Sequence, residues 1–142
     1  FHRLISICEH LAEMTGTRLE HRVDGYTYED IRNNEVLEDF LQANFEALGE
    51  PVMPRKKELG IGCTDMGDVT HKVPGLQSYI MVVPGVRGHT QEFDDACGTP
   101  AGYRAIEVAA KAVAMTGVDM LTDPSAIVRV REAFQAMKAK YE

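Results

Sequence analysis

Residues 76–83 read LQSYIMVV and are followed directly by Pro84 and Gly85. A short apolar run that ends in a Pro-Gly turn is typical of a β-strand. The surrounding segment, Leu59 to Phe93, sets six glycines among short apolar runs. Glycine at this density marks tight turns and close approaches of the backbone. We therefore expect a strand at 76–83 with glycine-rich loops on either side.

Residues 17–24 carry a second strand signal. Leu19, His21 and Val23 alternate with charged residues, as in a strand with one solvated face. The preceding residues, Leu4 to Met14, recur at helical spacing, and Gly16 follows as a C-cap. This helix and strand predict the end of a sheet whose other strands lie elsewhere, since an isolated pair is not stable.

Three further helices follow along the chain. One starts after an N-cap in Asn33-Asn34 and ends at Gly49, one covers residues 101–115, and one begins at Asp123-Pro124. In the helix at 101–115 we expect an inward face made by Ile106, Ala109, Ala110 and Val113. The spacing of the large apolar residues in the last helix predicts that it packs along one stripe. This stripe is made by Ile127, Val130, Phe134, Met137 and Tyr141. Helices and strands together predict an α/β fold.

Composition excludes several classes of function. The 142 residues hold 15 Lys and Arg against 22 Asp and Glu, a formal charge of −7 with a pI near 5.2. This acidity argues against nucleic acid as a partner. The longest apolar run, Ile80 to Val83, is far short of the roughly 20 residues that cross a membrane. Three widely spaced cysteines form no disulfide framework, which favours a reducing, cytoplasmic location.

Candidate functional residues gather in two loops, at 62–71 and 87–92. His89 follows the predicted strand, where a neutral imidazole is suited to ligate a metal or act as a general base. Asp65 and Asp68 are acceptors for a ligand or a metal, or turn residues. Cys63 is either a nucleophile paired with His71 or a small buried hydrophobe. A zinc site needs about three or four ligands, so these loops predict at most half of an active site.

Two motifs resemble those of zinc-dependent amidohydrolases and carboxypeptidases related to aminoacylase and aminobenzoyl-glutamate hydrolase. Residues 62–75, GCTDMGDVTHKVPG, are similar to the family's GSTDxGNVSxxVP segment, and residues 87–93, RGHTQEF, to its late GHTxEF stretch. Cys63 and Asp68 stand where many relatives have Ser and Asn. The resemblance covers only the C-terminal part of such an enzyme. It implies that residues 1–30 end the lid, or dimerisation, domain and that 31–142 form the C-terminal part of the catalytic domain.

The resemblance also implies roles for individual residues. His89 would be a ligand of a two-metal centre holding zinc, manganese or cobalt. Gly62, Thr64 and Asp65 would bind substrate, namely a dipeptide, an N-acyl amino acid or an aminobenzoyl-glutamate-like amide. The full-length protein would form a homodimer through its lid.

The family's remaining metal ligands and its glutamate base have no counterpart in these residues. The chain also begins without Met inside a helical pattern, so we expect a fragment that is inactive alone. Two alternatives stay open: a non-catalytic binding or dimerisation module derived from the same fold, and a hydrolase that uses Cys63 and His71.

Overall fold

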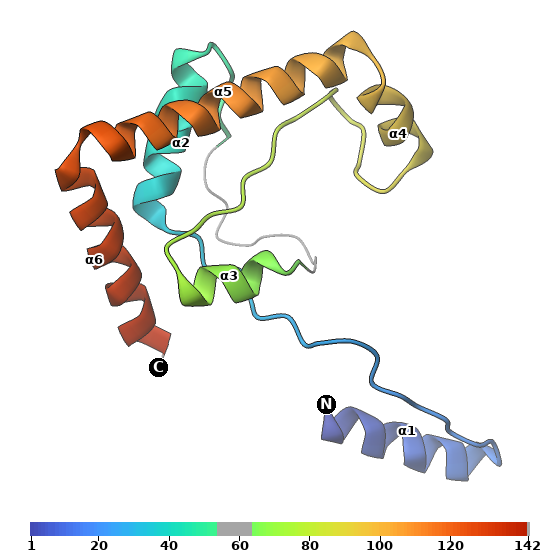
Figure 1. Ribbon diagram of the computed structural model, residues 1–142. Coiled ribbons are helices and arrows are strands. Elements are labelled where there is room, and N and C mark those ends of the chain that lie inside the picture. Colours follow the sequence, from blue (N-terminus) through green and yellow to red (C-terminus); the bar gives the residue numbers. More distant parts are fainter. Residues whose placement is uncertain (54–63, 142) are drawn as a thin grey trace.

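The computed structural model describes residues 1–53 and 64–141. Within these ranges the chain forms six helices (Figure 1): α1 (His2–Thr15), α2 (Glu35–Ala47), α3 (Met66–Lys72), α4 (Gln91–Cys97), α5 (Pro100–Thr122) and α6 (Pro124–Tyr141). Helix α3 and the first turn of α4 lie in the segment, 59–93, that the sequence predicts as a strand with glycine-rich loops. Gly62 and Cys63 lie outside the described residues.

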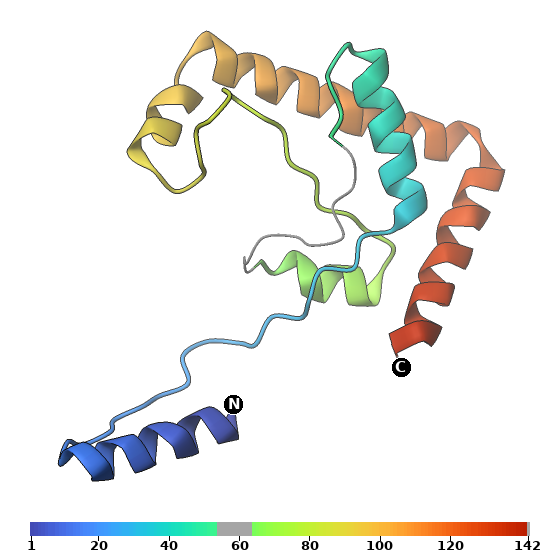
Figure 2. The same cartoon turned by 180° about the vertical axis from the view of Figure 1, so that it is seen from behind.

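The predicted α/β fold is wrong for the described residues, because they contain no strand or sheet. Neither residues 17–24 nor residues 76–83 form the expected strand. Figures 1 and 2 show the two segments in different parts of the molecule, the first between α1 and α2 and the second between α3 and α4. A strand exists only when a second strand supplies hydrogen-bond partners. Alternating polarity and β-branched residues are properties of the side chains of one segment. They do not supply the second strand with which its backbone would pair.

Helix α5 is the centre of the packed part, and α2, α4 and α6 contact it. Its buried positions are small residues, namely Gly102, Ala105, Ala112 and Thr116. The expected inward face is wrong, since Ile106 and Val113 are 65% and 62% exposed and Ala110 is exposed as well. Helix α5 is apolar over more than half of its circumference, so periodicity alone does not choose the packed side. The side with small residues packs, because it lets neighbouring helices approach closely.

Helix α2 is tied to its neighbours by two buried asparagines. Asn34, the predicted N-cap, accepts a hydrogen bond from the Leu37 N–H at 3.2 Å and donates to the Val130 carbonyl of α6 at 2.9 Å. Asn44 donates to the Thr116 hydroxyl and, at 2.8 Å, to Asp119 of α5. Buried amides that are hydrogen-bonded to neighbouring helices hold those helices in one register, because leaving the amides unpaired is costly.

Two other predicted helix boundaries are confirmed, whereas the predicted end at residue 115 is wrong, because α5 continues to Thr122. Gly16 ends α1 in the left-handed conformation with φ 66°. Asp123 precedes α6, and its carboxylate accepts from the Ser125 N–H at 2.9 Å. The predicted stripe of α6 is buried at Val130 and Phe134.

Helix α1 and residues 17–28 leave apolar surface uncovered. No residue of α1 is buried, although Leu4, Ile7, Leu11 and Met14 line one side of it. Figures 1 and 2 show α1 apart from the other helices. The accessible surface of the chain is 11260 Å², whereas a folded monomer of 15.8 kDa exposes roughly 7300 Å². Among the described helices, none combines the length and the hydropathy needed to cross a bilayer.

Candidate functional site

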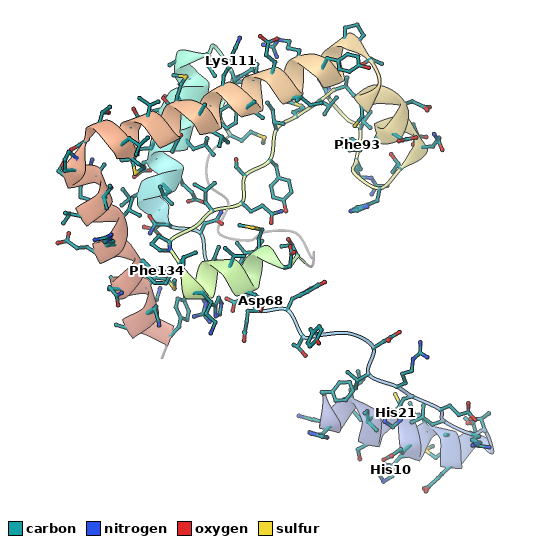
Figure 3. All side chains as sticks on the ribbon, in the orientation of Figure 1. His10, His21, Asp68, Phe93, Lys111 and Phe134 are labelled. Carbon is teal, nitrogen blue, oxygen red and sulfur yellow. The ribbon has the colours of Figure 1, made fainter. Side chains whose placement is uncertain are left out.

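Helix α3 fastens the segment that leads into α2. The Asp68 carboxylate accepts from the Glu29 N–H at 3.3 Å, and the Thr70 hydroxyl accepts from the Arg32 N–H at 3.1 Å. Thr70 also donates to the Gly67 carbonyl at 2.9 Å and is fully buried. Figure 3 shows Asp68 on α3, beside this segment. The 62–75 motif therefore positions a stretch of chain almost 40 residues away in sequence.

Gly67 makes this close approach possible. A Cβ atom at this position would lie against the carbonyl oxygen and carbon of Glu29, well inside van der Waals contact. The backbone of residues 29–30 therefore passes directly over α3 where a side chain would stand. This is the close backbone approach that glycine density indicates in a sequence.

The Asn33 side chain binds the chain that follows α3. It pairs with both backbone groups of one residue there, as a neighbouring strand would do. Its side chain accepts from the Gln77 N–H at 2.9 Å and donates to the Gln77 carbonyl at 3.1 Å. The next residue, Asn34, donates its N–H to the Gly75 carbonyl at 2.8 Å. Residues 75–77 are thereby set in a defined position without forming a strand.

Thr64 and Asp65, two of the predicted substrate-binding residues, stand beside this fastened segment. The Thr64 hydroxyl lies 3.1 Å from Gln77 Oε1 and 3.4 Å from Asp65 Oδ1, and it accepts from the Met66 N–H. Gln77 Nε2 donates to the Tyr79 hydroxyl at 2.9 Å. Asp65 and Tyr79 are exposed, whereas Thr64 and Gln77 are half-buried. The third predicted substrate-binding residue, Gly62, lies outside the described residues.

His89, the predicted metal ligand, is exposed in the turn that precedes α4. Its φ of 64° places it in the left-handed region, the one such non-glycine residue in the described part of the chain. Histidine enters this region more readily than most residues, but the conformation is still uncommon. Thr90 follows and caps α4, accepting from the Phe93 N–H at 3.3 Å. His89 therefore projects from a tight turn and not, as expected, from a strand end.

The described residues do not bring His89 into a metal site. No hydrogen bond or ion pair among them joins it to Thr64 or Asp65. One group of three potential ligands occurs in residues 1–53 and 64–141, formed by Glu29, Asp30 and His71 with ligand atoms within 4.8 Å of one another. His89 is not part of it. A metal at His89 would need further ligands from outside these residues.

A cation, Arg32, already lies against the group of Glu29, Asp30 and His71. Arg32 donates to the Asp30 carboxylate through Nε at 3.2 Å and Nη2 at 3.1 Å. His71 Nε2 lies 3.0 Å from the Asp30 carbonyl and 3.2 Å from its carboxylate. The guanidinium opposes a divalent ion at this carboxylate, since like charges repel. In this structure the contact between His71 and Asp30 links the 29–32 segment to α3.

The sequence did not indicate a role at the site for Asp30, Gln77 or Tyr79, and it indicated Asn33 only as part of a helix N-cap. Asp30 and Arg32 are close neighbours in sequence, but Asp30 and His71 are 41 residues apart. Local patterns carry no signal for pairs at that separation. The sequence did contain one signal for this site, namely the cluster of hydrogen-bond acceptors in and near the 62–75 motif.

A concave region lies beside the 30–35 segment. It is a cavity of about 390 Å³ between this segment and α6, whose wall includes Phe134 and Met137. The Arg32 guanidinium stacks over the Tyr141 ring here, 4.4 Å from its centre. None of Thr64, Asp65 and His89 lines this cavity.

Acid is expected to weaken the ion pair between Asp30 and Arg32. Hydrogen bonds from Arg32, and then its charge, hold the pKa of Asp30 below the ordinary value of 3.8. A lowered pKa in the folded state means that the ionised group stabilises the fold above pH 3.8. That contribution is lost as the pH falls through the lowered pKa. It is small, since 64% of the side chain is exposed.

An NMR titration of the Asp30 carboxyl carbon measures this directly. The substitution Arg32→Gln should raise the pKa of Asp30 toward 3.8, whereas Lys140→Gln, a matched loss of charge on α6, should leave it in place. An unchanged pKa in Arg32→Gln would show that the guanidinium does not control Asp30.

Two curated proteins are similar to this chain. An Xaa-Arg dipeptidase from Mus musculus is 28% identical over 123 residues, and an Xaa-Arg dipeptidase from Homo sapiens is 27% identical over 123 residues. Each alignment covers 85% of this chain and 28% of the relative, so the chain spans less than a third of their length. No family model matches. The chain is thus related, at low identity, to peptidases.

Proposed function

We propose that this chain is the C-terminal part of a metal-dependent amidohydrolase or peptidase. The substrate class is a dipeptide, an N-acyl amino acid or an aminobenzoyl-glutamate-like amide, and the chain is inactive by itself. Residues 1–30 would end a lid domain that forms a homodimer, and residues 31–142 would belong to the catalytic domain of a cytoplasmic enzyme.

The observation that carries this proposal is the similarity to two dipeptidases over 85% of the chain. The resemblance of residues 62–75 and 87–93 to two family motifs, in the same order, agrees with it. Since the relatives are Xaa-Arg dipeptidases, dipeptides with a C-terminal arginine are the first substrates to test.

Exposed apolar surface supports the proposal that further residues of a longer protein pack against this chain. One side of α5 presents a stripe without charged residues, made by Tyr103, Ile106, Ala110, Val113, Ala114, Gly117 and Leu121. All seven are exposed. The chain exposes roughly 4000 Å² more than a folded monomer of its mass. That excess is several times the area, about 800 Å² per partner, that an ordinary interface covers.

Within this proposal the described residues supply part of the chemistry. Thr64 and Asp65 would contact the substrate, and His89 would donate one imidazole nitrogen to a zinc, manganese or cobalt ion. The other ligands would come from residues outside this chain. Asp68, Thr70 and Gly67 would keep the substrate loop in place through their contacts with residues 29–32.

The test compares this chain with the complete enzyme. With zinc or manganese added, the 142-residue chain is expected to release no arginine from Ala-Arg above the buffer rate. The longer reading frame that contains it is expected to hydrolyse Ala-Arg, and a chelator should abolish this activity. Turnover by the isolated chain would contradict the fragment assignment. A longer protein that binds no metal and cleaves no amide would instead favour the non-catalytic module.

A further inference from the structure

Residues 1–28 are joined to the rest of the described chain through one short stretch, residues 29–32. The hydrogen bonds and ion pairs that residues 1–28 make with described residues all stay within that segment. In Figures 1 and 2 the chain crosses α3 on its way from this segment to α2. The first hydrogen bonds to later residues run from the Glu29 N–H to Asp68 and from the Arg32 N–H to Thr70. A displacement of residues 1–28 therefore reaches the helices through residues 29–32.

Helix α3 depends on the same stretch for its own position. The main helix packings of the described residues join α2, α4, α5 and α6, and α3 takes part in none of these. Its hydrogen bonds to residues 29–32 are made by Asp68, Thr70 and His71. Gly67 lets the backbone of that stretch lie directly against the helix. A helix of seven residues that is held in this way follows the segment that holds it.

The N-terminal end of α3 carries two of the proposed substrate-binding residues, Thr64 and Asp65. The Thr64 hydroxyl accepts from the Met66 N–H at 3.3 Å, and the Thr64 carbonyl accepts from the Gly67 N–H at 3.4 Å. The Asp65 carbonyl accepts from the Val69 N–H at 3.4 Å. Both residues are thus bonded to the first turn of the helix, and they move with it as one body.

We propose that α3 links the placement of residues 1–28 to substrate binding. The helix is held along its side by residues 29–32 and carries Thr64 and Asp65 at its start, so a shift of the stretch shifts both residues. This inference rests on the proposed function, in which residues 1–30 end a lid domain, and adds a regulation of the same substrate site. Coupling between two sites is reciprocal. Bound substrate must therefore stabilise the contact between residues 29–32 and α3.

Amide hydrogen exchange in the complete, metal-loaded enzyme tests this reciprocity. The probe is the phosphinic analogue of Ala-Arg, in which a phosphinate and a methylene replace the scissile amide, and its saturation is established from inhibition of Ala-Arg hydrolysis. It should slow exchange of the Glu29 and Arg32 N–H groups about 5-fold or more, the lower end of ordinary coupling between sites. The Leu37 N–H of α2, bonded to the Asn34 side chain, should not respond. Unchanged exchange at Glu29 and Arg32 would overturn the inference.

The Thr70 hydroxyl supplies the matching variants. Thr70→Val keeps a similar shape but removes the acceptor of the Arg32 N–H, so the response of Glu29 to the analogue should fall below about 2-fold. KM for Ala-Arg should rise about 3- to 10-fold while kcat changes less than about 2-fold, because the substrate contacts shift and the reacting groups do not. Thr70→Ser, which restores the hydroxyl, should return both properties toward the wild type. Thr122→Val removes an exposed hydroxyl at the end of α5 and should leave KM unchanged.

The remaining outcomes separate this link from the proposed function. Should Thr70→Val not fold, Asp68→Ala removes the acceptor of the Glu29 N–H from a half-buried position and makes the same test with Arg32 as the reporter. A folded, active variant with the wild-type KM and the wild-type exchange response would refute the link alone. A complete wild-type protein that cleaves no amide would refute the proposed function, and the link with it.

Discussion

Replacing His89 in the complete enzyme is expected to lower kcat/KM for Ala-Arg by about 100-fold or more, together with its metal content. Loss of a residue that only supports a metal ligand already costs about 10- to 100-fold. Loss of a ligand itself should cost at least as much. His89 is exposed in a turn, so its imidazole is accessible to groups from outside the described part of the chain.

Two substitutions separate the imidazole from the backbone. His89→Ala removes the ring and also strains the left-handed backbone, whereas His89→Gly removes the ring and relieves that strain. Both should lose activity and metal if His89 is a ligand. Retained activity and metal in His89→Gly would show that only the turn matters. His21→Ala serves as the control, because His21 is also exposed and lies between α1 and α2.

Replacing Gly67 with alanine is expected to destabilise the chain by roughly 1–3 kcal/mol, the usual cost of overpacking. The added methyl would meet the Glu29 carbonyl, which is backbone and cannot move aside by rotating a side chain. The segment at 29–32 must then leave α3, which breaks the bonds from the Glu29 and Arg32 N–H groups to Asp68 and Thr70. Urea unfolding measures the free energy, and amide hydrogen exchange measures the two N–H groups.

Gly117→Ala is the matched control for this change. Gly117 also lies inside a helix, but a Cβ there meets no atom within 4 Å. Alanine is the better helix former by about 0.8–1 kcal/mol, so this variant should be more stable than the wild type. An equal response of the two variants, or unchanged exchange at Arg32 in Gly67→Ala, would show that α3 does not hold the 29–32 segment.

Local interactions explain the parts of the fold that were predictable. Gly16, Asn34 and Asp123 mark helix ends because a cap acts on backbone groups within a few residues of itself. Helix α5 runs to Thr122, beyond the predicted end at 115, because no strong breaker precedes Pro124.

The site was predictable only in its composition. The polar loops around Asp65 and His89 stood out by residue type and by their glycines, and the resemblance supplied roles that stay predictions. The links among Thr64, Gln77 and Asn33, and that between Asp30 and His71, were not predictable. They join residues far apart in sequence, which no periodicity describes.

By itself, the sequence determined where helix α1 ends, where α2 and α6 begin, that α6 packs by one face, and that the chain is acidic. Only the tertiary structure decided which apolar side of α5 is buried, because either side satisfies helical periodicity and packing chooses the one with small residues. It also decided that residues 17–24 and 76–83 are not strands among the described residues. A helix makes its backbone hydrogen bonds within its own segment, whereas a strand depends on a partner that its own sequence cannot supply.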